Sequence, residues 1–217
     1  HIQYRNGRYE DAIKTYSRAL RITRQCFAQS TSHMLSVACT CNCLGVLHFH
    51  LANGDADKAM AFYNEALAIH QSTMGQEAET KEIATIINNI GRVYYMKAEY
   101  STALAQYSKA LSIRRQRFGN NHLDVAATIY NAGQTLHQRG DLEQAMTLYE
   151  EFLAIAKSRL GYHHRDVAIM LKCMAQVHHE RKEFDRAIQL YEEAAAVAKV
   201  ALGTNHPEVA TIYNKVS

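Results

Sequence analysis

The feature that most constrains the fold is a pattern that returns at nearly constant spacing along the whole chain. An alanine is followed four residues later by a tyrosine at Ala12/Tyr16, Ala59/Tyr63, Ala103/Tyr107, Ala145/Tyr149 and Ala187/Tyr191, and the tyrosines are 47, 44, 42 and 42 residues apart. A second mark, a Val or Ile that precedes an alanine, recurs at Val37, Ile83, Val125, Val167 and Val209. Repetition of this length indicates stacked supersecondary units that present a surface for recognition.

Each unit reads as a pair of helices. We number a repeat from its Val or Ile as position 0. Apolar or small residues then occupy positions 4, 7, 8 and 11, as in Ile129, Ala132, Gly133 and Leu136, and this spacing is typical of one face of a helix. Position 8 is Gly45, Gly91, Gly133, Ala175 and Ser217. Because glycine costs a helix about 1 kcal/mol relative to alanine, its return predicts close approach of a partner helix.

The second helix of a unit follows a short polar turn and carries the alanine and tyrosine. It ends in a glycine, at Gly75, Gly119, Gly161 and Gly203, for which we expect the left-handed conformation that closes a helix. A histidine then precedes an acidic residue, at His122, His164 and His206. We interpret these histidines as linker residues and expect the acid to complement the dipole of the next helix.

The first part of the chain is less regular. The connections from Ala12 to Val37 and from Ala59 to Ile83 are 25 and 24 residues long, whereas each later one has 22. We therefore expect an irregular N-terminal region, with a first helix that ends at Asn6 and a turn near Gly7. Because the chain opens near one helix end and closes at Ser217 partway through another helix, we expect a piece of a longer protein.

The pattern Val-Ala-x-x-Ile/Leu-x-Asn-x-Gly/Ala, followed by Gly-Asp/Glu-Tyr/Leu-x-x-Ala-x-x-x-Tyr-x-x-Ala-Leu-x-Ile, resembles the tetratricopeptide repeat (TPR) in the 42-residue form of kinesin light chains. The resemblance implies an all-α, right-handed superhelical solenoid of antiparallel helix pairs, with about four full repeats. The expected domain is one solenoid over 1–217, with a partial repeat 1–36, repeats 37–82, 83–124, 125–166 and 167–208, and a partial repeat 209–217.

The resemblance also implies that the first helices line a concave groove and that asparagines at positions 5 and 6 hold a ligand backbone. If positions 4, 7, 8 and 11 are buried, positions 5, 6 and 9 face the other side. The candidate peptide-binding residues are Asn42, Asn88, Asn89, Arg92, Tyr130, Asn131, Gln134, Lys172, Gln176 and Asn214. Amides both donate and accept hydrogen bonds, and the bases favour a peptide with Asp or Glu. The alternative for this row is an ordinary solvated surface.

A clamp for the carboxylate tail of a chaperone is a sharper alternative, and the sequence argues against it. Such a clamp needs a lysine at position 5 with an asparagine at position 9, but Lys172 is followed by Gln176. It also needs a base at position 2, where the chain has Cys39, Thr85, Ala127, Ile169 and Thr211. We therefore predict a protein-interaction scaffold that binds an extended, acidic peptide segment. The alternative is a structural subunit of a larger assembly that uses its convex face or terminal helices.

Composition excludes several other classes. With 24 basic and 21 acidic residues the net charge is +3, which predicts no nucleic-acid partner, and no apolar run approaches the ~20 residues of a membrane helix. Five cysteines at irregular spacing indicate free thiols in the cytoplasm or another reducing compartment. Cys39, Cys41 and Cys43 do not form a tetrahedral zinc set. We find no catalytic motif, so we predict no enzyme activity, no cofactor and no metal.

Overall fold

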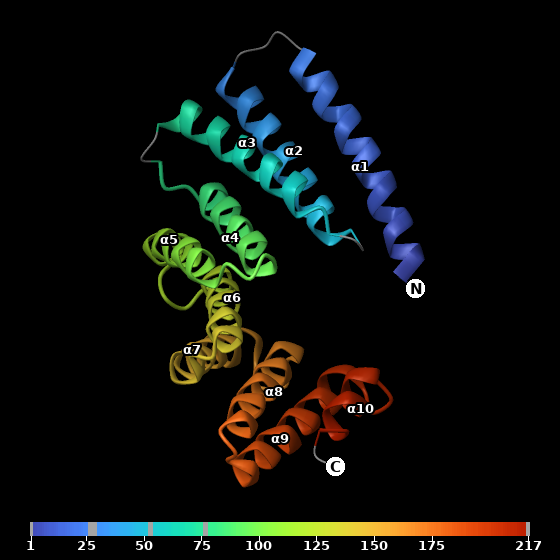
Figure 1. Cartoon of the computed structure of the whole chain (residues 1–217), viewed down its shortest axis with the longest axis vertical. Helices are drawn as coiled ribbons and strands as arrows, with labels where there is room; N and C mark the ends of the chain where they lie inside the picture. The colour runs from blue at the N-terminus through green and yellow to red at the C-terminus, as the bar shows by residue number, and fades with distance from the viewer. Residues whose placement is uncertain (1, 26–29, 52–53, 76–77, 216–217) are drawn as a thin grey trace. The chain divides into compact units, whose positions relative to one another are not determined.

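The computed structural model describes residues 2–25, 30–51, 54–75 and 78–215, and side chains from residue 8 onward (Figure 1). The described ranges contain ten α-helices and no other regular element, as the sequence predicted. They belong to two compact units, His1–Ile113 and Arg114–Ser217, which are described separately below. Cys26, one of the five cysteines, and the position-8 residue Ser217 lie outside the described residues.

The first unit consists of successive helix pairs. It contains α1 (Ile2–Gln25), α2 (Thr31–His50), α3 (Ala56–Met74), α4 (Lys81–Met96) and the part of α5 (Tyr100–Phe118) up to Ile113. Helix α2 packs mainly against α3, and each of these also contacts the helix before or after it, α1 and α4 respectively. Ile83, Ala84 and Ile87 of α4 form a buried cluster with Ala110 and Ile113 of α5, so the array grows by contacts between neighbours in sequence.

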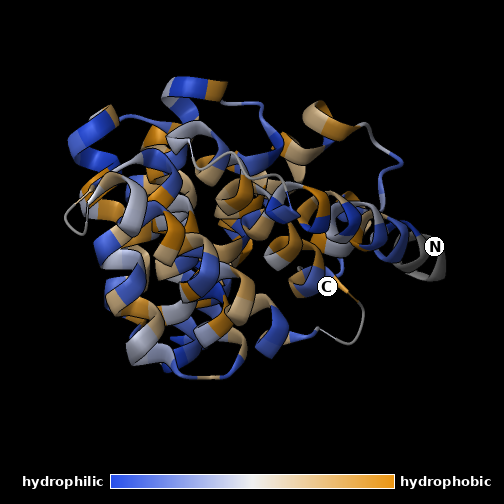
Figure 2. Ribbon diagram, turned by 90° about the horizontal axis from the view of Figure 1, so that it is seen from above, coloured by the Kyte–Doolittle hydropathy of each residue, from blue (hydrophilic) through white to orange (hydrophobic). Residues whose placement is uncertain are grey.

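The second unit repeats this arrangement. After the end of α5 it contains α6 (Leu123–Arg139), α7 (Leu142–Leu160), α8 (Arg165–Glu180), α9 (Phe184–Leu202) and α10 (Pro207–Tyr213). The closest pairs are α6 with α7 and α8 with α9, while α7 packs on α8 and α9 on α10. Single helices in Figure 2 carry both hydrophobic and hydrophilic residues, which is the pattern of helices that bury one face.

In three of the pairs the repeated glycine and tyrosine form the contact between the two helices, whereas α8 has Ala175 at this register. A Cβ placed on Gly91 would lie 2.7 Å from Cε1 of Tyr107, and one on Gly133 would lie 2.7 Å from Cε1 of Tyr149. Both tyrosines are fully buried. The predicted close approach at position 8 is thus confirmed, and its cause is the flat ring of the partner helix, which leaves no room for a methyl group.

The expected irregularity of the N-terminal part is confirmed, but its predicted form is wrong. Helix α1 runs without interruption from Ile2 to Gln25, so Asn6 does not end a helix and Gly7 is not in a turn. A single interior glycine costs about 1 kcal/mol, which a 24-residue helix tolerates. Helix α2 begins one turn earlier than its counterparts, because the Ser30 hydroxyl accepts a hydrogen bond from the His33 N–H (3.3 Å).

The turns inside the pairs use one backbone geometry with different residues. Gly140 has φ 91°, and at the same register Ala98 and Lys182 have φ 59° and 63°. The left-handed region is unfavourable for residues with a Cβ. The turns at Ala98 and Lys182 are therefore held in this conformation by the packing of the helices that they join.

The glycines that end the second helices differ from the expected left-handed cap. Gly75, Gly161 and Gly203 combine φ of 101°, 88° and 92° with ψ of 151°, 160° and 152°. This region is open almost only to glycine. After Gly203 the chain makes a tight turn, in which the His206 N–H donates to the Gly203 carbonyl at 3.2 Å.

The linker histidines cap the first helices that follow them. Nδ1 of His122 accepts the Asp124 N–H at 3.1 Å, Nδ1 of His164 accepts the Asp166 N–H at 3.1 Å, and His206 acts likewise on α10. Thr80 occupies the same register and caps α4 with its hydroxyl. The structural role predicted for these histidines is therefore confirmed. The structure shows in addition what this role is, because each histidine is the N-cap of the helix that follows it.

Candidate functional site

Each unit has its own candidate surface, formed by positions 5, 6 and 9 of its first helices, which we call the polar face of that unit. In the first unit it belongs to α2 and α4, and in the second unit to α6, α8 and Asn214, the C-cap residue of α10. Most of the predicted residues on it are half-buried, namely Asn42, Arg92, Tyr130, Asn131, Gln134, Lys172 and Gln176; Asn214 is exposed, while Asn88 and Asn89 are buried.

The asparagines of the first unit are more enclosed than periodicity alone implied. Asn88 and Asn89 are each only 7% exposed. Nδ2 of Asn89 donates to Oδ1 of Asn42 at 3.2 Å and thereby joins α4 to α2. Position 6 thus faces the preceding first helix as well as the surface. In the free chain Asn89 stabilises the packing of two repeats, so a ligand would meet an amide that is already oriented.

Arg92 is the main cation of the polar face in the first unit. Its Cζ lies 4.3 Å from the ring centroid of Phe49, and its Nη2 lies 3.4 Å from Nε2 of His50. Burial, and to a lesser degree the charge of Arg92, lower the pKa of His50, so that this imidazole stays neutral beside the guanidinium. Within the described ranges no carboxylate pairs with Arg92. The aromatic ring holds the cation in place and leaves its charge uncompensated.

The second unit supplies amides and one cation. Nε2 of Gln134 donates to Sγ of Cys173 at 3.2 Å, which joins position 9 of one first helix to position 6 of the next. Burial raises the pKa of Cys173, so its thiol is neutral. The Tyr130 ring packs on Phe152 with centroids 5.9 Å apart. Lys172 is half-buried and, in the part of the chain that the structure describes, has no acidic partner.

Glu180, the acid at position 13 of α8, is already engaged. Oε1 of Glu180 lies 2.9 Å from Nε2 of His137. Nδ1 of the same imidazole lies 3.3 Å from the Tyr149 hydroxyl. His137 thus connects the carboxylate to the buried tyrosine of its own pair. The positive charge of the polar face comes from Arg92 in the first unit and from Lys172 in the second.

The cysteine cluster of α2 does not form a reactive centre. Cys39 is exposed, Cys43 is half-buried and Cys41 is buried. Burial raises the pKa of Cys41 to about 12 and also raises that of Cys43, so both thiols are protonated and poor metal ligands at neutral pH. Among the described residues no group of three or more His, Cys, Asp or Glu side chains has a geometry suited to a metal ion.

Sequence reasoning found the cations and amides of the polar face but missed what holds them. Phe49 and His50 support Arg92 from the end of the neighbouring first helix, 43 and 42 residues earlier in the chain respectively. The signal was present in the sequence, because these two residues stand about one repeat length before Arg92.

None of the helices in the described ranges is both long and apolar enough to cross a bilayer.

Comparison with known proteins places the chain among repeat proteins. The tetratricopeptide repeat pattern matches residues 82–158 and 166–217, and a second pattern of the same description matches residues 1–27. No curated protein matches significantly. Among solved structures, BtubC (BKLC) from P. vanneervenii is 21% identical with a TM-score of 0.78, over 96% of this chain and 81% of that one.

Two further structures share the fold at low identity. TPR-like repeats attributed to a kinesin light chain of Podosopora anserina are 17% identical with a TM-score of 0.69, over 90% of this chain and 89% of that one. The Rap conjugation gene regulator of plasmid pLS20, in complex with the Phr* peptide, is 18% identical with a TM-score of 0.62, over 88% of this chain and 56% of that one.

Proposed function

Because the chain belongs to the tetratricopeptide repeat family, we propose that it is a protein-interaction module in which the polar face of each unit binds an extended, acidic segment of a partner protein. The observation that carries this proposal is the state of Arg92 and Lys172. Each is half-buried, each stands on a first helix, and neither has a carboxylate partner among the described residues. A cation that is partly desolvated and unpaired gains most when a ligand supplies the missing charge.

The amides of the polar face suit the backbone of such a segment. Asn131, Gln134 and Gln176 are half-buried, and a primary amide can donate to a peptide carbonyl and accept from a peptide N–H. An extended peptide leaves its backbone groups unpaired, so it needs these partners when it loses water. In each unit the amides would hold the backbone, and the cation, Arg92 in the first unit and Lys172 in the second, would select acidic side chains.

The comparisons support peptide binding only through the fold. The Rap regulator is described in complex with a peptide, Phr*, and it shares the fold of this chain. At 18% identity this likeness says nothing about which peptide binds here. The chemistry of the ligand is therefore argued from the residues of this chain alone, and the proposal includes neither a reaction nor a cofactor.

Selection from a library of random peptides, displayed on phage and panned on the whole chain, tests the proposal. We expect enrichment of sequences with Asp or Glu, and titration calorimetry should give affinities about tenfold weaker for Arg92→Ala or Lys172→Ala. Arg186→Ala and Lys109→Ala are matched controls, because both side chains are exposed on second helices and remove the same charge. Enrichment of neutral or basic peptides, or equal losses in the controls, would contradict the proposal.

One observation favours the structural-subunit alternative. On α9, Phe184 and Ile188 stand one helical turn apart and are 52% and 40% exposed. An apolar pair on a second helix suits a permanent protein contact more than a peptide groove. Hydrogen exchange on the chain inside its native complex separates the two functions. Protection centred on α9 would favour a subunit role, and protection of α4, α6 and α8 would favour segment binding.

A further inference from the structure

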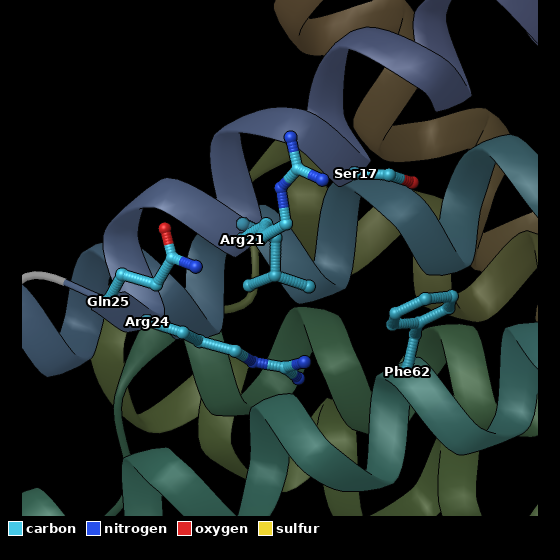
Figure 3. Close-up of a pocket in the computed structure, with 6 residues that line it drawn as sticks. Ser17, Arg21, Arg24, Gln25 and Phe62 are labelled. Carbon is cyan, nitrogen blue, oxygen red and sulfur yellow. The ribbon is translucent and has the colours of Figure 1, made fainter.

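A second surface lies between the helices α1 and α3, away from the polar face. A shallow pocket there is lined by Ser17, Leu20, Arg21, Arg24 and Gln25 of α1 and by Phe62 of α3 (Figure 3). In the close-up, Arg24 extends from α1 toward α3, and Phe62 rises from α3 toward α1. The pocket therefore combines cationic groups with apolar ones.

The apolar part of the pocket is firmly built. Leu20 is 4% exposed and belongs to the buried core of the first unit, against which Phe62 packs. The Phe62 ring is stacked on His48, with centroids 5.5 Å apart and planes at 17°. Leu20 and Phe62 form a fixed apolar floor that can receive an aliphatic or aromatic group.

The charges around the pocket are unbalanced. Arg24 pairs with Glu65 of α3, but neither Arg18 nor Arg21 has an acidic partner among the described residues. Residues 12–25 of α1 include four basic residues and no acidic one. The outer side of α1 is therefore positive next to an apolar floor.

Comparison of the repeats with one another shows that the charge of Arg21 is specific to α1, whereas α5 also has a base, Lys109, at the register of Arg18. Arg21 stands nine residues after the alanine mark of its helix, where the other second helices have Ala68, Ser112, Ala154 and Ala196. Arg18 stands six residues after the mark, where three of the other helices have Glu65, Glu151 and Glu193. Glu65 and Glu151 accept from Arg24 and Arg115 of the preceding second helices. Helix α1 thus carries a base in a column that is mainly acidic.

We propose that the pocket between α1 and α3 is a second docking site, which binds an acidic segment of a partner protein through an apolar side chain seated on Leu20 and Phe62 and a neighbouring carboxylate paired with Arg21. Charge complementarity selects this occupant: the pocket offers an unpaired guanidinium at its α1 edge, and a carboxylate binds guanidinium with two parallel hydrogen bonds.

A depleted peptide selection tests the site separately from the polar face. A random peptide library is first depleted on the Arg21→Ala chain, and the remaining phage are then selected on the natural chain. We expect the enriched peptides to carry Asp or Glu within a few residues of Leu, Met or Phe. Their affinity should fall about tenfold in Arg21→Ala and also fall in Phe62→Ala. Arg92→Ala should leave it unchanged.

The variants and readouts keep the proposal falsifiable. Arg21→Ala places at this register the residue that α3, α7 and α9 already have, so circular dichroism should show an unchanged fold. Bound peptide should protect α1 and α3 from hydrogen exchange. Affinity that survives Arg21→Ala, or protection confined to other helices, would overturn the proposal. So would selected peptides without acids, or a single-stranded oligonucleotide that binds this face more tightly than any peptide and is displaced by none.

Discussion

The contact between glycine and tyrosine inside a pair makes a quantitative prediction about position 8. In Gly133→Ala the new methyl carbon would stand 2.7 Å from Cε1 and 2.9 Å from Cδ1 of Tyr149, and 3.5 Å from Cβ of Leu148. Tyr149 is fully buried, so its ring cannot swing into solvent to make room. The substitution therefore has two opposite effects on the free energy of unfolding: the steric clash lowers it, and the better helix propensity of alanine raises it.

The two terms have known sizes. Overpacking of a tight core costs about 1–3 kcal/mol, whereas replacing glycine by alanine inside a helix gains about 1 kcal/mol. We expect Gly133→Ala to lower the free energy of unfolding by up to about 2 kcal/mol. In a Tyr149→Leu background the ring is gone, so the same substitution should raise the free energy by about 1 kcal/mol. The effect of one methyl group should thus change sign.

Urea denaturation of the four chains of this cycle, followed by circular dichroism, measures the coupling. Hydrogen exchange would show whether the change is confined to α6, α7 and their neighbours. A matched control is Ala175→Gly in α8, which removes a methyl that the chain already accommodates at this register and should destabilise by about 1 kcal/mol. Equal effects of Gly133→Ala in both backgrounds would refute the steric reasoning.

Three further predictions concern turns, caps and acid. Lys182→Gly should raise the free energy of unfolding by about 0.5–1 kcal/mol in urea titration, because Lys182 has φ 63° and glycine adopts this conformation without strain; a loss of stability would contradict this. His164→Ala should lower the free energy of unfolding, measured by heat or urea, by about 1 kcal/mol because the N-cap is lost. His164→Thr, which copies the Thr80 cap, should recover most of this loss. Equal losses in both variants would be inconsistent with capping. Burial lowers the pKa of His70 below its usual 6.5, so the unfolded chain binds more protons than the folded chain and stability should fall as the pH drops through 6.5. His70→Leu should weaken this pH dependence, whereas the exposed control His163→Gln should not, and identical pH profiles for all three chains would contradict the assignment.

The sequence predicted those parts of the fold that depend on contacts within one repeat. The apolar stripe at positions 4, 7, 8 and 11, the tyrosine register and the glycine at position 8 follow from the helical period, and the structure has them. Period and turn residues also placed α4, α6 and α8 correctly. Each of these features is fixed by residues fewer than thirty positions apart, so the sequence alone is enough to read them.

Other features depend on how one repeat lies against the next, which periodicity does not describe. Position 6 was expected on the open side of the first helix, but Asn89 is 7% exposed because the neighbouring first helix covers it and supplies Asn42 as a partner. The continuity of α1 through Gly7 was missed because a turn register was read into a segment with few repeat marks. Arg21 was overlooked although the sequence contains the signal, which appears only when the second helices are aligned column by column.

The proposed recognition of acidic segments by the polar face is tested most directly by a charge exchange at Lys172. A peptide selected on the natural chain is titrated by calorimetry into that chain and into Lys172→Glu, and then a peptide in which one glutamate is replaced by lysine is titrated into both. We predict that Lys172→Glu weakens the acidic peptide by more than about tenfold and that one lysine-substituted peptide regains affinity for the variant only. Equal affinity of the acidic peptide for both chains would contradict the assignment of the polar face as the binding surface.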